Sequence, residues 1–104
     1  VAPVFGIRAW AAFDGTLTGT NAPAAGGNVA SITRNSVGDY TITFSIPMQD
    51  ADYAFAISGG NTAGVLLYKQ KDGQNKNASY FPLSSYSSAG VLTDVASISI
   101  FFIR

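Results

Sequence analysis

Alternation along one short segment constrains the fold more than any other feature of this sequence. Within residues 39–46 every second side chain is apolar, and threonine and serine fill the positions between them. The apolar positions are Tyr40, Ile42, Phe44 and Ile46. A period of two residues is typical of a half-buried β-strand, and aromatic and β-branched residues favour that conformation. Pro47 predicts the end of the strand, because proline cannot donate a hydrogen bond to a neighbouring strand.

The rest of the chain consists of similar short apolar runs separated by glycine, proline, asparagine and serine. We expect further strands at residues 4–13, 29–34, 52–58, 65–71 and 95–103. No amphipathic helical stretch of useful length occurs. The pattern predicts a single all-β domain over residues 1–104, folded as an antiparallel β-sandwich or a small barrel-like sandwich.

Turn residues indicate how these strands are joined. Residues 35–38 predict a tight hairpin in which Gly38 is free to adopt a positive φ. Residues 15–27 are expected to hold a weak edge strand and a loop. Residues 59–64 and the serine-rich stretch 84–90 are expected to be loops.

Charge and residue types exclude several classes of function. Six basic residues are balanced by six acidic ones, so the chain lacks the clustered positive charge with which proteins bind nucleic acid. Histidine and cysteine are absent, which removes the commonest general base, the thiol nucleophile and the usual zinc ligands. No apolar run approaches the ~20 residues of a membrane-spanning helix. We therefore expect no enzyme, no cofactor, no nucleic-acid partner and no membrane insertion.

The carboxylates do not offer a catalytic pair either. Asp50 and Asp52 are the closest two in sequence. A glycosidase pair must flank a bond across a cleft, and a calcium loop needs several oxygen ligands at regular offsets. We interpret Asp50 and Asp52 as turn residues that follow Pro47.

The strands expected at the two ends of the chain are apolar on both faces. In residues 4–13, one face holds Phe5, Ile7 and Phe13, and the other holds Val4 and Trp10. In residues 95–103, one face holds Val95, Phe101 and Ile103, and the other holds Ile98, Ile100 and Phe102. A strand that is apolar on two sides needs cover on two sides. We expect a homo-oligomer in which the interface includes Phe5, Trp10, Phe101 and Ile103. The alternative is a closed barrel that buries both faces within one chain.

Polar and aromatic residues in the middle of the chain suggest a contact surface. Tyrosine in a polar loop offers a flat apolar ring with a hydroxyl group, which suits carbohydrate or protein recognition. The candidate contacts are Asn61, Thr62, Asn75, Asn77, Tyr80 and Tyr86. The alternative is that the tyrosines pack the rim of the sandwich.

Several segments together resemble a domain of tailed-phage structural proteins. Residues 8–16, RAWAAFDGT, resemble the opening RAWxxF(N/D)GT of that family. Residues 28–35, NVASITRN, and 38–44, GDYTITF, resemble its hairpin. Residues 47–53, PMQDADY, are similar to an MPDANY stretch with proline and methionine exchanged, and 97–102, SISIFF, resemble its terminal strand.

The resemblance implies the C-terminal tip domain of a tail fibre, trimeric and exposed on the virion outside the cell. Such tips bind a host cell-surface glycan or protein and contact other virion proteins. The resemblance also implies that the chain is the last piece of a longer one. It does not extend over residues 58–94 and carries no functional residue across. A capsid-decoration or head-fibre domain without receptor binding, and a free-standing lectin-like module, are the alternatives.

Overall fold

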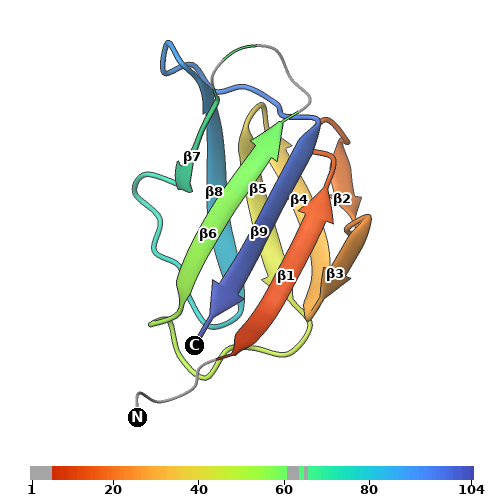
Figure 1. Ribbon diagram of the computed structural model, residues 1–104, viewed down its shortest axis with the longest axis vertical. Coiled ribbons are helices and arrows are strands. Elements are labelled where there is room, and N and C mark those ends of the chain that lie inside the picture. The colour runs from red at the N-terminus through yellow and green to blue at the C-terminus, as the bar shows by residue number, and fades with distance from the viewer. Residues whose placement is uncertain (1–5, 61–63, 65) are drawn as a thin grey trace.

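The computed structural model describes residues 6–60, 64 and 66–104, and these form two antiparallel sheets packed face to face (Figure 1). The described strands are β1 (Ile7–Phe13), β2 (Gly19–Asn21), β3 (Ala25–Gly27), β4 (Val29–Ser36), β5 (Asp39–Phe44), β6 (Ala54–Gly60), β7 (Leu66–Gln70), β8 (Tyr80–Ser87) and β9 (Ser97–Ile103). The all-β expectation is confirmed, and the two layers correspond to a β-sandwich.

The two sheets divide the strands unequally. The front sheet has the order β3-β1-β9-β6, and the back sheet has the order β2-β4-β5-β8-β7. Figure 1 shows β1, β9 and β6 lying across β4, β5 and β8. The terminal strands β1 and β9 are neighbours, and β9 is paired on both sides, with β1 and with β6. The two-sided strand therefore lies in the centre of its sheet.

The core fills the space between the sheets, and alternation selects its members. Tyr40, Ile42 and Phe44 of β5 face Ile98, Ile100 and Phe102 of β9 across the sandwich, and all are buried. Burying a side chain of this size stabilises the fold by roughly 1.5–3 kcal/mol. The expected alternation is confirmed in both strands.

The outward face of β9 meets solvent. Phe101 has 40% of its surface exposed, and Trp10, its partner in β1, has 44% exposed. The closed barrel that would bury both faces within one chain is therefore wrong for this strand.

Three expected side-chain positions at strand ends are also wrong. Ile46 lies beyond the end of β5 and is 72% exposed. A register shift between Ile7 and Ala9 turns Ile7 away from the face of Phe13, which leaves Ile7 59% exposed. Val95 precedes β9 and is fully buried instead of facing outward with Phe101.

Two expected loops contain strand. Residues 84–90 begin within β8, where Ser84 and Ser85 are buried. Ser85 tolerates burial because its amide donates to the Gly38 carbonyl at 2.9 Å and its hydroxyl donates to the Thr93 carbonyl at 2.6 Å. Residues 59–64 likewise begin within β6, which continues to Gly60.

The hairpin turn is confirmed, whereas the stretch 15–27 differs from the expectation. Gly38 has a φ of 66° in the hairpin between β4 and β5. The stretch 15–27 contains two short edge strands, β2 and β3, rather than one.

Asn28 joins the two sheets at the start of β4. Its φ of 56° lies in the left-handed region, which asparagine tolerates better than most residues. The side-chain amide donates to the carbonyls of Arg8 and Ile46 at 3.2 and 3.0 Å, and its oxygen accepts from the Ile46 amide at 2.7 Å. Asn28 thus connects β1 to the segment that follows β5.

Replacing Asn28 tests this connection. Asn28→Ala is expected to lower the free energy of unfolding by roughly 3 kcal/mol, because it removes hydrogen bonds and adds left-handed strain. Asn28→Gly removes the same hydrogen bonds without the strain and should cost less. Urea unfolding of the three proteins measures both effects. An alanine variant as stable as the glycine variant would contradict the role of the backbone conformation.

Candidate interaction face of the front sheet

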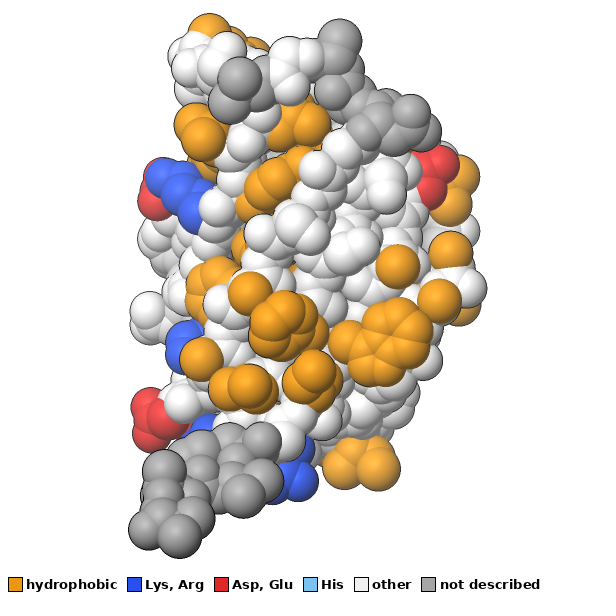
Figure 2. Space-filling view, in the orientation of Figure 1, with side chains coloured by type: hydrophobic (Ala, Val, Ile, Leu, Met, Phe, Trp, Pro, Cys, Tyr) orange, Lys and Arg blue, Asp and Glu red, His pale blue; other side chains and the backbone are white. Residues whose placement is uncertain are grey.

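The outer face of the front sheet consists mainly of apolar and small side chains. Its outward positions are Trp10 and Ala12 in β1, Ser99, Phe101 and Ile103 in β9, and Ala54, Ala56 and Ser58 in β6. None of these carries a charge. Figure 2 shows hydrophobic side chains gathered on this face, with charged groups at its margins. Contiguous exposed apolar patches of this kind mark interaction sites.

Strand register arranges these residues in rows across the sheet. Phe101 pairs with Trp10 on one side and with Ala56 on the other. Ser99 pairs with Ala12 and with Ser58 in the next row. The two rows border a shallow hollow of about 290 Å³. On this face, therefore, two aromatic rings lie beside a group of small side chains.

Glycine in β3 makes room for the tryptophan. A Cβ added to Gly27 would lie 2.7 Å from Nε1 of Trp10, closer than any real contact. Only glycine at this position lets the indole lie over the neighbouring strand. This packing leans the ring toward the β3 edge of the sheet.

The sequence-predicted interface residues fall into three groups. Trp10 and Phe101 are direct cross-strand partners. Ile103 lies at the end of the same face, paired with Ile7 and Ala54, and is partly buried. Phe5 lies outside the described residues. Arg8 lies at this end of the sheet, where its guanidinium donates to the Arg104 carbonyl at 3.0 Å.

The sequence-predicted binding residues are not brought together as one site. Asn61 and Thr62 lie outside the described residues. Tyr80 and Tyr86 stand at opposite ends of β8, and six residues of strand span roughly 20 Å.

The asparagines near Tyr80 have different surroundings. The side-chain oxygen of Asn77 accepts from the amides of Ser79 and Tyr80 at 2.8 and 3.0 Å, and the asparagine therefore shapes the turn before β8. Asn75 is exposed in the preceding loop.

Tyr86 has neighbours that sequence reasoning missed. Lys69 lies over its ring, with Nζ 5.2 Å from the centroid, and is paired with Asp72 at 2.9 Å. Leu67 pairs with Tyr86 across the strands, and the group borders a depression of about 340 Å³. The alternation of β7, which puts Leu67 and Lys69 on one face, is the signal that would have found them.

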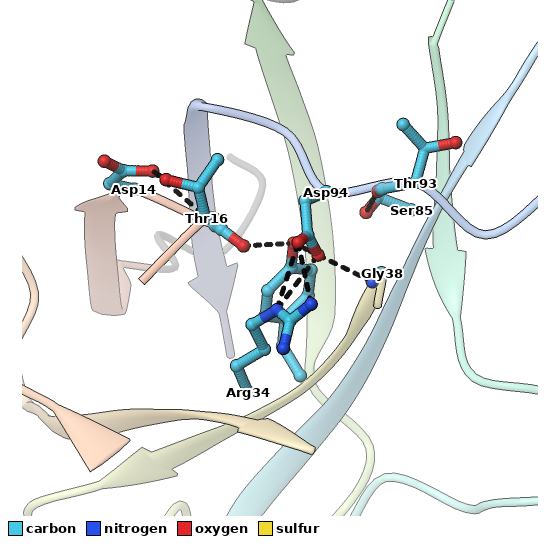
Figure 3. A network of polar contacts seen from close by, with 9 residues as sticks. Asp14, Thr16, Arg34, Gly38, Ser85, Thr93 and Asp94 are labelled. Carbon is cyan, nitrogen blue, oxygen red and sulfur yellow. Dashed lines mark hydrogen bonds and ion pairs between the residues drawn. The ribbon is translucent and has the colours of Figure 1, made fainter. Parts of the chain in front are cut away.

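A second cluster surrounds Asp94 (Figure 3). Arg34 donates to both carboxylate oxygens at 2.8–3.1 Å, the Gly38 amide donates at 2.9 Å, and the Tyr40 hydroxyl lies at 3.2 Å. Burial opposes the charge, but the hydrogen bonds from these groups outweigh it and lower the pKa of Asp94. Burial raises the pKa of Tyr40 to about 12. The cluster contains no nucleophile paired with a base and fixes the segment that leads into β9.

Asp50 has a structural role as well. Asp50 accepts from the Asp52 amide at 2.9 Å, so the turn interpretation of this pair is confirmed. Arg104 also donates to both oxygens of Asp50, at 3.0 and 2.7 Å, and holds the pKa of that carboxyl well below its usual range. Among the described residues, no three histidine, cysteine, aspartate or glutamate side chains are grouped to hold a metal ion.

The described part of the chain contains no helix that is long and apolar enough to cross a membrane. Comparison of the whole chain with protein-family models, curated proteins and solved structures found no match.

The Asp94 cluster makes stability depend on pH. Asp94→Asn is expected to lower the free energy of unfolding at pH 7 by roughly 2 kcal/mol, because hydrogen bonds to a charged group are lost. The pKa of Asp94 is lower in the folded chain than in the unfolded one, where it is about 4. The carboxylate therefore stabilises the fold above that value, and the stabilisation is lost as the pH falls through the folded pKa.

Urea unfolding at pH 7 and at pH 3 measures this dependence. The difference in the free energy of unfolding between the parent protein and Asp94→Asn should be smaller at pH 3 than at pH 7. The control is Asp72→Asn, which breaks an exposed ion pair and should change stability little at either pH. A difference that is equally large at both pH values would contradict the role of the Asp94 charge.

Proposed function

We propose that this domain is the self-associating tip of a tailed-phage fibre or spike, a homotrimer that attaches the virion to the host surface. The apolar outer face of the front sheet, on which Trp10 and Phe101 are cross-strand partners, carries the proposal. In a single chain, Trp10 and Phe101 leave a large part of their apolar surface in water. Association removes that surface from water, which is favourable in proportion to its area. The resemblance of residues 8–16 and 28–44 to phage structural proteins supports the same assignment.

The contrast between the two sheets supports the front sheet as the associating face. The outer face of the back sheet presents hydroxyl groups, among them Ser31, Thr33, Thr41 and Thr43. Thr33 and Thr20 share a hydrogen bond at 2.9 Å there. The β4–β5 part of this face is suited to water, whereas the face with Trp10 and Phe101 is suited to a protein partner.

Host contact is assigned to the group around Tyr86. The group combines an aromatic ring, an ammonium and a carboxylate beside a shallow depression, and these are groups that bind a glycan or a polar protein surface. Charged residues are scarce, so recognition relies on hydrogen bonds and stacking at short range.

A second function is a virion structural domain, such as a capsid decoration or head fibre, that assembles without binding a receptor. The separation of Tyr80 and Tyr86 favours it, because the expected contact residues do not converge. The turn role of Asn77 favours it as well.

The solution mass tests self-association. Light scattering of the purified chain is expected to give three times the 10.8 kDa of one chain. A mass of one chain at all concentrations would contradict the trimer and favour a free-standing lectin-like module.

Cell binding separates attachment from a purely structural role. Fluorescently labelled domain is incubated with a panel of bacterial strains, and Tyr86→Ala is expected to lower binding to a positive strain at least tenfold. Tyr80→Ala on the same strand is the matched control and should bind as the parent does. Thermal unfolding of each variant confirms that it is folded. Equal binding by both variants would contradict the assignment of the host contact to Tyr86. No binding to any strain would favour the virion structural domain.

A further inference from the structure

The front sheet ends at β6, and within the described residues no strand is paired beyond it. Strand β6 pairs with β9 at all seven of its positions without a register shift. It contains no charged residue and no proline, the features with which proteins protect exposed edges from pairing with another chain. The β7 edge of the back sheet, by contrast, is shorter and includes Lys69. Among the described strands, β6 is thus the one best suited to accept another strand.

The opposite edge of the same sheet is β3, which has complementary polarity. Every pairing in the front sheet is antiparallel, so β1 and β6 run one way and β3 and β9 the other. A rotation about an axis parallel to the strands would therefore bring β6 of one copy antiparallel to β3 of the next. A three-fold assembly needs such a pair of different surfaces, whereas a two-fold dimer would pair β6 with itself.

The width of the sheet fits a three-fold arrangement. Strands lie ~4.8 Å apart, so four of them span ~19 Å, and three such sheets set as a triangular prism have their planes ~5.5 Å from the axis. Packed sheets lie ~10 Å apart, so each contributes ~5 Å of side chain to the space between them. The side chains on the outer face of the front sheet therefore reach far enough to fill the space around the three-fold axis.

The side chains of that face suit this position. Trp10 and Phe101 lie on the two central strands, nearest the axis, and the next row there is Ala12 and Ser99. The lean of Trp10 over Gly27 carries the indole toward β3, into the corner that β6 of the next copy would close. Neither of these two rows carries a charge; the nearest charged residue of β1 is Arg8, which donates to the Arg104 carbonyl at the end of the sheet.

We propose that three copies of this chain close into a triangular prism. The outer faces of their front sheets line the three-fold axis, and β6 of each copy runs antiparallel to β3 of the next along a corner of the prism. This arrangement rests on the proposed self-association and names the surfaces that form it.

Trp10 is the probe for the arrangement, because it is the only tryptophan in the chain. Fluorescence and light scattering are followed together on dilution of the full 104-residue chain. In the trimer, the emission of Trp10 is expected to shift to the blue and acrylamide quenching to fall at least threefold relative to the dissociated chain.

A matched pair of substitutions tests the axis directly. Ser99→Asp brings three carboxylates close to the axis, and the concentration at half-assembly is expected to rise at least tenfold. Ser31→Asp makes the same change on the outer face of the back sheet and should leave assembly unchanged. Circular dichroism confirms that both variants keep their β structure.

The outcomes separate this inference from the proposed function. A trimer in which Trp10 remains freely quenched, or which tolerates Ser99→Asp as well as Ser31→Asp, would overturn the prism and leave self-association standing. A mass of two chains would also overturn it. A mass of one chain at all concentrations would overturn both. The fluorescence measurement needs no substitution, so the test holds even where Ser99→Asp fails to fold.

Discussion

Phe102 fixes the relation between the two sheets. Its ring packs edge-on against Phe44 at 5.0 Å and Phe81 at 5.4 Å, both from the back sheet, and against Tyr53 at 5.6 Å. Edge-to-face pairs of this geometry contribute about 0.5–1.5 kcal/mol each beyond the area that they bury. Because successive side chains of a strand point to opposite faces, a buried Phe102 turns Phe101 outward, beside Trp10. The apolar outer face is thus a consequence of how the core is packed.

The Asp94 cluster fixes the same strand from its other end. The carboxylate holds Arg34 of β4 and the hairpin amide of Gly38, and the following Val95 carbonyl accepts from the Gly15 amide at 2.9 Å. β9 therefore enters the front sheet from a point tied to both sheets. A slip of one residue would exchange the faces of Phe101 and Phe102, and the two anchors together oppose it.

The sequence pattern was sufficient to predict strands and turns that are determined by neighbouring residues. The alternation of residues 39–44 and the glycine of the hairpin were sufficient for β5 and its turn. Burial of Ser84 and Ser85 was not predictable, because the partners of Ser85, Gly38 and Thr93, are brought to it only by the tertiary fold. The bulge that exposes Ile7 has no composition signal. The pairing of Trp10 with Phe101 required the order of the strands, which alternation does not contain.

The two sheets differ in what their outer faces can do, and the difference bears on attachment. If the front sheets surround a three-fold axis, the only broad faces left to meet a receptor are those of the back sheets. Tyr86, Lys69 and Leu67 project from the outer face of that sheet, at its β7 edge. The proposed assembly and the proposed recognition would then use opposite faces of one sandwich, so substitutions on the two faces are expected to act separately. The Lys69–Asp72 ion pair lies on the back sheet beside Tyr86, away from the face on which Trp10 and Phe101 lie.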